Sequence, residues 1–171
     1  MRLPTVLSTA RLELRMWRID DAPAYRALID ANDAHLRPWL PFMRNEPRTP
    51  SQTEAFLADA IRLFLSDTHY RYGLWYGGQV VGEVLLLGRG GPRTMELGYW
   101  LDAGHMGLGL VTEASRVLVQ AGLSLPDVDR IIIRCDVGNG PSNAIPPRLG
   151  ATLEEVEHTE MAELLNVWSV T

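Results

Sequence analysis

Two short stretches hold the side chains that could do chemistry, residues 96–113 and residues 135–142. Glu96 could act as a general base, and Ser142 could donate a hydrogen bond or a proton. Each has a structural alternative: Glu96 as a solvated strand glutamate paired with an arginine, and Ser142 as a helix N-cap. Cys135 lies among isoleucines with no histidine near it in sequence, which favours a buried thiol over a nucleophile.

Glycines interrupt the first of these stretches between two periodic segments. Residues 96–101 alternate with period two, which predicts a strand. The segment that follows predicts an amphipathic helix with one apolar face, formed by Leu110, Val111, Ala114, Val117, Leu118 and Ala121. A glycine turn between a strand and a helix start presents backbone N–H groups and the positive end of a helix dipole. We therefore predict that the turn at 104–109 binds an anion, such as the pyrophosphate of a nucleotide-like cofactor.

Composition excludes several classes of protein. All sixteen basic residues are arginine, so neither a lysine Schiff base nor a P-loop lysine is available. One cysteine and four scattered histidines predict no disulfide and no metal site. The formal charge of −5 argues against a non-specific nucleic-acid binder and leaves room for a cationic or amine-bearing substrate. The sequence has neither a membrane-length apolar run nor a signal-peptide core, which predicts a cytoplasmic protein without a membrane anchor.

The first half of the chain predicts the elements that must lie under the glycine turn. Residues 11–17 alternate as a strand with one solvated face, and Asp20 or Asp21 then caps a helix that ends near Ala34. A loop at 35–50 with four prolines either covers the sheet edge or faces a substrate. A second helix begins at Ser51, where Glu54 completes a capping box. Two β-rich runs, 70–76 and 80–87, flank Gly77 and Gly78 as a hairpin.

The second half predicts a parallel strand and a closing hairpin. A nearly continuous apolar run at 130–137 suits a strand buried on both faces and parallel to the strand before the helix, in one right-handed βαβ unit. A short element at 142–149 ends at Gly150, and residues 151–157 and 164–170 pair as a hairpin. With 171 residues the whole chain, 1–171, is predicted as a single α/β domain with a mixed sheet and the order β-α-α-β-β-β-α-β-α-β-β.

Four short motifs in this order resemble those of the GCN5-related N-acetyltransferase (GNAT) family. They are Glu-Leu-Gly-Tyr-Trp-Leu at 96–101, Gly-Leu-Gly-Leu-Val-Thr-Glu-Ala at 107–114, Asn-Gly-Pro-Ser at 139–142 and Arg-Leu-Gly at 148–150. Arg-Leu-Glu-Leu-Arg at 11–15, Pro-Trp-Leu-Pro at 38–41 and Asn-Val-Trp-Ser-Val at 166–170 fit the branch of ribosomal-protein N-terminal acetyltransferases, the RimJ/RimL type. The resemblance covers almost the whole chain. It implies a central, splayed sheet flanked by helices, and a homodimer.

The resemblance also implies acetyl-CoA as the co-substrate and places it. Its pyrophosphate would lie on the turn and its pantetheine would pair between the splayed strands that contain Glu96 and Cys135. A freed N–H near Leu101 would polarise the thioester carbonyl. Arg148 could reach the adenosine 3′-phosphate or be a surface arginine. The implied contacts to the cofactor are Leu101, Met106, Gly107, Leu108, Gly109, Leu110, Val111, Thr112, Asn139 and Arg148.

Two departures from the family pattern bear on binding. Gly104 and Met106 stand where glutamine or arginine is frequent, so a side-chain donor to the phosphates is missing while the backbone cradle remains. Pro146 and Pro147 lie inside the last short helix, which predicts a short or 3₁₀-like turn. No tyrosine lies in residues 142–149, although many relatives use one as the acid.

The resulting prediction is an acetyl-CoA-dependent N-acetyltransferase that acts on a primary amine by direct attack in a ternary complex. By resemblance Glu96 is the base and Ser142 the acid, and a protein N-terminal α-amine is the favoured acceptor. Trp39 and Trp100 could wall the acceptor pocket or pack in the core. The glutamates between 154 and 163 could attract a cationic acceptor or form a solvated face. The alternatives are a polyamine or antibiotic acetyltransferase and a catalytically silent acyl-CoA-binding regulator.

Overall fold

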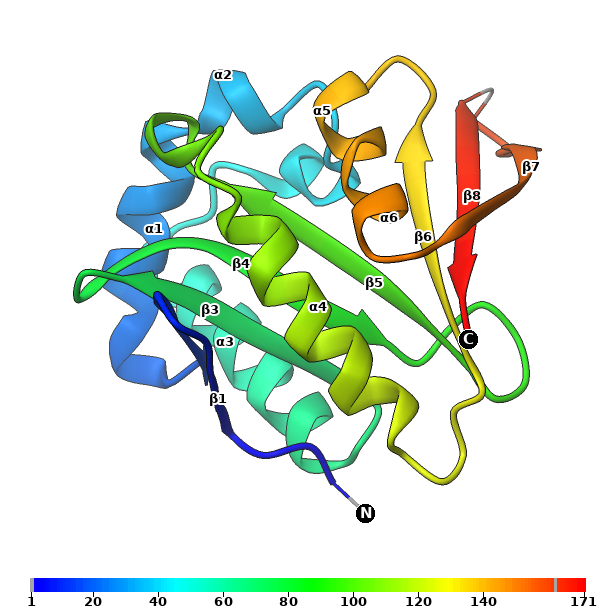
Figure 1. Cartoon of the computed structure of the whole chain (residues 1–171). Coiled ribbons are helices and arrows are strands. Elements are labelled where there is room, and N and C mark those ends of the chain that lie inside the picture. Colours follow the sequence, from blue (N-terminus) through cyan, green and yellow to red (C-terminus); the bar gives the residue numbers. More distant parts are fainter. Residues whose placement is uncertain (1, 162) are drawn as a thin grey trace.

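The computed structural model describes residues 2–161 and 163–171. Its strands form one mixed sheet in the order β1-β2-β3-β4-β5-β6-β8-β7 (Figure 1). The strands are β1 Val6–Ser8, β2 Leu12–Met16, β3 His69–Tyr76, β4 Gln79–Leu87, β5 Thr94–Leu101, β6 Arg130–Asp136, β7 Thr152–His158 and β8 Leu164–Val170. The helices are α1 Ala22–Ala31, α2 Asp33–Leu36, α3 Pro50–Leu65, α4 Leu110–Leu123, α5 Gly140–Asn143 and α6 Ile145–Arg148, with 3₁₀ turns at Ile19–Asp21, Pro41–Asn45 and Ala103–His105.

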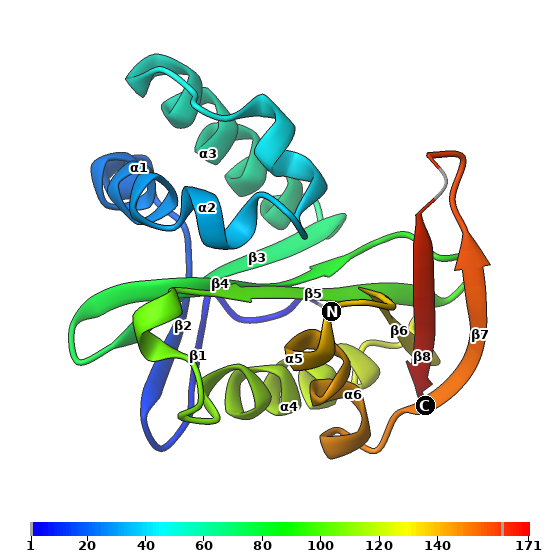
Figure 2. The ribbon, with the colours of Figure 1, turned by 90° about the horizontal axis from the view of Figure 1, so that it is seen from above.

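The sheet separates two layers of helices. Seen from above in Figure 2, α1, α2 and α3 cover one face, and α4, α5 and α6 cover the other. This agrees with the predicted flanked mixed sheet. The predicted element order is confirmed apart from β1 and α2, which the sequence prediction lacked, and apart from the division of the last helix into α5 and α6. β1 is short and half-exposed, so its three residues carry too little periodicity to be detected.

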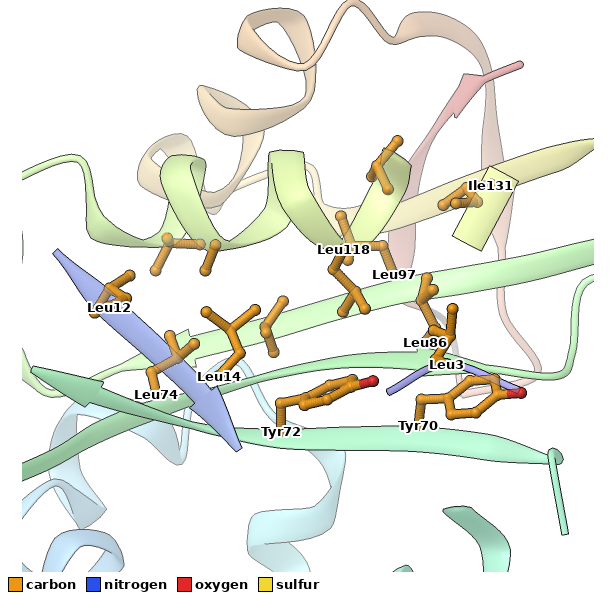
Figure 3. Packing of buried hydrophobic residues seen from close by; sticks show 14 of the residues in the cluster. Leu3, Leu12, Leu14, Tyr70, Tyr72, Leu74, Leu86, Leu97, Leu118 and Ile131 are labelled. Atoms are coloured by element: carbon orange, nitrogen blue, oxygen red, sulfur yellow. The ribbon is translucent and has the colours of Figure 1, made fainter. Parts of the chain in front are cut away.

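Apolar residues on alternate strand positions fill each layer. Leu12, Leu14, Leu74, Leu86 and Leu97 belong to the cluster between the sheet and α4, and Leu118 of α4 lies beside Leu97 (Figure 3). On α4 the buried positions include Val119 in place of the predicted Val117, which is half-buried. A second cluster lies under α1 and α3 and consists of Trp17, Ala22, Tyr25, Ile29, Leu36, Met43, Leu57 and Trp100.

The predicted hairpins and the βαβ unit are confirmed. Gly77 and Gly78 have φ of 56° and 81° between the antiparallel strands β3 and β4, the left-handed backbone that such turns require. β5 pairs in parallel with β6, and α4 is the crossover helix between them. β7 and β8 pair as the closing hairpin.

Helix boundaries differ from the prediction at two places. The first helix ends at Ala31, and Asn32 turns the chain into the separate α2. The capping box of α3 is formed by Thr49 and Gln52, so the predicted box at Ser51 is wrong. Pro50 explains the earlier start, because proline suits the first helical position, where the N–H needs no partner. The proline-containing element is confirmed as a short turn, split into α5 and α6.

β5 and β6 separate halfway along their length. Their pairing runs from Thr94 opposite Arg130 to Leu97 opposite Ile133, yet β5 continues to Leu101 and β6 continues to Asp136. The N–H of Asp102 donates to the carbonyl of Val81 on β4 at 2.7 Å. Because backbone groups alternate along a strand, the N–H of Leu101 points the other way, toward the gap. The predicted splay is present, with a backbone donor facing it.

Candidate active site

The glycine turn lies between β5 and α4, with Gly107 and Gly109 at φ of 79° and 76°. These left-handed conformations favour glycine because other side chains would clash with their own backbone. The first bond of the α4 ladder runs from the N–H of Glu113 to the carbonyl of Gly109 at 3.0 Å. The N–H groups of residues 110–112 precede that ladder and therefore face outward at the positive end of the helix dipole. This turn has the backbone geometry of an anion site.

Arg11 holds this turn from the edge of β2. Its Nη1 donates to the carbonyl of Leu108 at 2.9 Å, and its Nε donates to Glu113 Oε2 at 2.8 Å. Glu113 also accepts from Thr9 and from the Arg11 backbone N–H. Although partial burial opposes ionisation, these donors lower the pKa of Glu113 below its ordinary value. Glu113 is thus a structural anchor, and Arg11 brings a positive charge to a turn where the sequence predicted none.

Glu96 lies on β5 with 8% of its side chain exposed. Arg89 binds it through two hydrogen bonds, at 2.7 Å to Oε2 and 2.8 Å to Oε1, and Arg134 donates to Oε2 at 2.7 Å. Arg134 also donates to Glu157 at 2.6 Å. Glu96 is therefore a buried member of an ion-pair network rather than a solvated strand glutamate. The two guanidiniums fix the orientation of its carboxylate.

Ser142 meets Cys135 and Tyr99 on the opposite side of the gap. The Ser142 Oγ donates to Cys135 Sγ at 3.3 Å, and the Tyr99 hydroxyl donates to the Ser142 carbonyl at 2.9 Å. Burial raises the pKa of the Cys135 thiol and the pKa of the Tyr99 hydroxyl. A raised pKa keeps the thiol neutral, which agrees with the buried-thiol interpretation. Tyr99 was missed because its only sequence signal is an ordinary position on a strand.

Asn139 and Asn143 shape the turn that carries Ser142. Asn139, not Ser142, is the N-cap of α5: its Oδ1 accepts from the Ser142 N–H at 3.2 Å. The alternative of Ser142 as the cap is wrong, because the chain turns three residues earlier. Asn143 donates to the carbonyls of Asp136 and Asn139, both at 2.8 Å. Its Oδ1 accepts from Asn166 Nδ2 at 2.8 Å, which ties α5 to β8. Asn143 carries no sequence signal beyond its amide.

Three further predicted site residues, Trp39, Trp100 and Arg148, differ in their surroundings. Trp100 is buried, and its indole N–H donates to Glu83 Oε2 at 2.9 Å, whereas Trp39 is 42% exposed after α2. Arg148 is exposed at the end of α6. His105 Nδ1 lies 2.7 Å from Asp102 Oδ2 at the start of the turn.

The acidic run is largely engaged with arginines. Glu154 pairs with Arg130, Glu157 with Arg134, and Glu163 with Arg44. These contacts favour a paired surface over an attractive field for cations. In residues 2–161 and 163–171, no group of three or more His, Cys, Asp or Glu side chains could hold a metal ion. No helix in the same residues is both long enough and apolar enough to span a bilayer.

The gap divides the reactive groups between two faces of the sheet. Glu96, Gly98 and Trp100 alternate onto the α1 face, while Tyr99 and Leu101 alternate onto the α4 face with the core. A group threaded between β5 and β6 would have hydroxyls on one face of the sheet and, on the other face, the Glu96 carboxylate next to the paired end of the gap. Such an arrangement serves proton removal from one reactant and proton donation to another.

The comparison with protein families identifies the class of protein to which this fold belongs. Residues 11–152 match the family described as "Acetyltransferase (GNAT) domain", so the chain belongs to the GNAT acetyltransferases. It is an N-acetyltransferase of the branch that includes the ribosomal-protein acetyltransferases.

Particular relatives come from bacteria. The chain is 29% identical over 140 residues to the putative ribosomal N-acetyltransferase YdaF of Bacillus subtilis, covering 81% of this chain and 76% of that protein. It is 36% identical over 74 residues to the ribosomal-protein-serine acetyltransferase of Escherichia coli, covering 43% of this chain and 40% of that protein.

Solved structures share the fold. The microcin C7 self-immunity acetyltransferase MccE, in complex with acetyl-CoA and AMP, has a TM-score of 0.87 at 24% identity and covers 95% of this chain and 93% of its own. The ribosomal α-N-protein acetyltransferase RimL, in complex with coenzyme A, has a TM-score of 0.87 at 23% identity and covers 98% of this chain and 96% of its own.

Proposed function

We propose that this chain transfers the acetyl group of acetyl-CoA to the α-amine of a protein N-terminus. The observation that carries the proposal is the separation of β5 from β6 directly upstream of the glycine turn. A free strand edge can pair with the pantetheine amides, and the turn can bind the pyrophosphate. Similarity to ribosomal-protein acetyltransferases supports the acceptor class.

The donor brings an activated thioester, and this chain's residues bind and orient it. A backbone N–H near Leu101, freed where β5 separates from β6, would donate to the thioester carbonyl as negative charge develops on its oxygen. Ser142 would donate to the departing sulfur, and Tyr99 supports it by binding the Ser142 carbonyl. Asn143 holds the same turn against β6 and β8, which keeps the Ser142 hydroxyl at the gap.

Glu96 would serve the acceptor amine. A carboxylate has about four acceptor sites, and Arg89 and Arg134 occupy three of those on Glu96. One site on Oε1 is left for the amine or for a water between the amine and the carboxylate. The two arginines thus leave Glu96 a single direction in which to accept a proton.

The acid–base demands of amines favour an α-amine. With a pKa near 7.7, roughly one-sixth of an α-amine is neutral at pH 7, against about one part in 2,500 for a lysine amine near 10.4. Removing the proton at pH 7 therefore costs less free energy for an N-terminal α-amine than for a lysine amine, and a single oriented carboxylate suffices more readily for the α-amine.

The test is thiol release from acetyl-CoA with a panel of acceptors. The panel holds peptides with free N-termini, the same peptides with blocked N-termini and an internal lysine, and polyamines. Since the chain has no lysine, acetyl-lysine in the mixture can come only from the acceptor. We expect turnover with free N-termini alone. Faster turnover with polyamines would instead support a small-amine acetyltransferase, and CoA binding without turnover would support the silent acyl-CoA-binding protein.

Variants test the assigned roles. Glu96→Gln should lower kcat with little change in the affinity for acetyl-CoA. Glu54 lies on the exposed face of α3, and Glu54→Gln should leave kcat unchanged. Ser142→Ala should slow turnover at least tenfold. Because Asn139 rather than Ser142 caps α5, the loss of the hydroxyl removes no cap, so a stable but slow variant is expected. A rate for Glu96→Gln equal to the wild-type rate from pH 6 to pH 8 would remove Glu96 from the mechanism.

A further inference from the structure

Asn32 stands between the two parts of the molecule that the proposed reaction needs. It lies at the corner where α1 ends and α2 begins, and it is 2% exposed. Its backbone N–H donates to the carbonyl of Ile29 at 3.1 Å, and its carbonyl accepts from the Leu36 N–H at 2.9 Å. Asn32 therefore ends one helix and begins the other. A buried asparagine at such a corner must satisfy its amide elsewhere.

The Asn32 amide binds the segment that begins the glycine turn. Its Nδ2 donates to Asp102 Oδ1 at 2.7 Å, and its Oδ1 accepts from the Ala103 N–H at 2.9 Å. The same Nδ2 donates to the carbonyl of Leu28 at 3.0 Å. One side chain thus joins α1 to the first two residues after β5.

Asp102 is the fixed point from which the turn starts. Its N–H is tied to Val81 on β4, and its Oδ2 accepts from the Gly104 N–H at 3.1 Å and contacts His105 Nδ1 at 2.7 Å. The conformation of residues 103–109 therefore depends on where the Asp102 carboxylate lies, and Asn32 holds one of its two oxygens.

On its other side Asn32 leads into the acceptor segment, which we define as residues 33–45. Within this segment Arg37 donates to the carbonyl of Met43 at 2.9 Å and to Asp33 Oδ1 at 2.8 Å, which braces α2 against the following 3₁₀ turn. Phe42 packs against Trp100 with ring centroids 6.4 Å apart. Trp100 shares a face of β5 with Glu96. The acceptor segment therefore borders the face on which the proposed base lies.

We propose that Asn32 is a positioning residue that couples the glycine turn to the acceptor segment. When the turn is occupied by a nucleotide pyrophosphate, its conformation is fixed, and the Asn32 amide transmits this restraint to α2. The inference rests on the proposed function, because it assumes that the turn binds CoA and that residues 33–45 border the acceptor. The contacts form one continuous chain of packed and hydrogen-bonded groups, through which such coupling can pass.

The experiment is hydrogen–deuterium exchange with coenzyme A as the probe. In the wild type we expect CoA to slow exchange in residues 107–112 and also in residues 33–40. In Asn32→Ala the slowing should persist at 107–112 and fall at least threefold at 33–40. Asn45→Ala is the matched control, because Asn45 is an exposed asparagine in the same segment and should leave both effects intact.

Exchanging the asparagine and the aspartate between positions 32 and 102 distinguishes loss of this hydrogen bond from a general loss of structure. Asn32→Asp places a second carboxylate beside Asp102, at a site where the present contact is 2.7 Å, and should abolish the coupling. Adding Asp102→Asn restores a donor and an acceptor in the opposite direction, so the double variant should recover protection at 33–40. The same loss in the single and the double variant would overturn the inference.

The two proposals fail in different ways. Protection at 107–112 without protection at 33–40 in the wild type would overturn the role of Asn32 and leave the acetyltransferase proposal standing. An absence of protection at 107–112 would overturn both.

Discussion

Glu83 offers the sharpest test of how the site is supported. This β4 glutamate is fully buried, and four donors surround its carboxylate. Trp17 Nε1 donates at 2.8 Å, Trp100 Nε1 at 2.9 Å, and Arg71 contributes two bonds at 2.8 and 2.7 Å. Burial alone would raise the pKa of Glu83, but Arg71 and the indole donors outweigh it and lower the pKa below its ordinary value. The carboxylate is thus charged, paired and fully hydrogen-bonded.

The perturbation is Glu83→Gln, which keeps the shape and removes the charge. Breaking a buried pair from one side costs about 3–5 kcal/mol, because the partner charge stays buried without compensation. Arg71 keeps 17% of its side chain exposed, so the lower end, about 3 kcal/mol, applies. For a chain of this size 1 kcal/mol corresponds to roughly 2–4 °C in Tm, which gives a fall of about 6–12 °C.

Thermal unfolding measured by calorimetry checks this value against two further variants. Asp59→Asn breaks an exposed pair whose side chains are 66% and 58% exposed, and it should change stability by less than about 1 kcal/mol. Adding Arg71→Met to Glu83→Gln removes the stranded charge and should recover at least half of the loss. A fall no larger than that of Asp59→Asn, or a double variant as unstable as the sum of its singles, would refute the reasoning.

Three further predictions concern the turn, the thiol and acid stability. Arg11→Ala should raise the Kd for CoA, measured by calorimetry, about tenfold, because the charge-assisted hydrogen bond from Arg11 to the turn contributes about 1.5–3 kcal/mol. Arg93 forms an exposed ion pair with Asp129, and Arg93→Ala should leave the Kd for CoA unchanged. Burial raises the pKa of Cys135, so iodoacetamide should alkylate it at least tenfold more slowly at pH 7.5 in the folded protein than in urea; equal rates would contradict the buried thiol. Glu83, Asp102 and Glu113 have lowered pKa values in the folded protein. Their contribution to the free energy of unfolding is therefore present above about pH 4.5 and is lost as the pH falls through the folded pKa values. The urea concentration at the unfolding midpoint should decrease when the pH is lowered from 6 to 3, and a midpoint that does not change with pH would contradict this prediction.

Sequence periodicity was sufficient for the parts of the fold that repeat locally. The alternation on β5, the glycine pair of the β3–β4 hairpin and the apolar run of β6 each carry their own signal within eight residues or fewer. The α3 cap shows the limit of such signals. Ser51 with Glu54 and Thr49 with Gln52 both fit a capping box, and Pro50 decides between them.

The candidate site was only partly accessible to the same reasoning. Glu96, Ser142 and the glycines were predicted because they lie within motifs. Arg11 and Asn32 were not, because their partners are 97 and 70 residues away in sequence. A local pattern holds no information on such pairs, and an arginine or asparagine has the same appearance whether it is solvated or buried.

These distant contacts change the interpretation of the glycine turn itself. Side chains from elsewhere in the sequence hold the stretch 96–113, among them Arg11 at Leu108 and Glu113, Asn32 at Asp102, Glu83 at Trp100, and Arg89 and Arg134 at Glu96. An anion site made of backbone N–H groups costs least to occupy when those groups are already oriented. The glutamine or arginine that Gly104 and Met106 replace would add one donor to the phosphates. The turn in this chain is instead oriented from outside, so its affinity for CoA should depend on residues that never touch the cofactor.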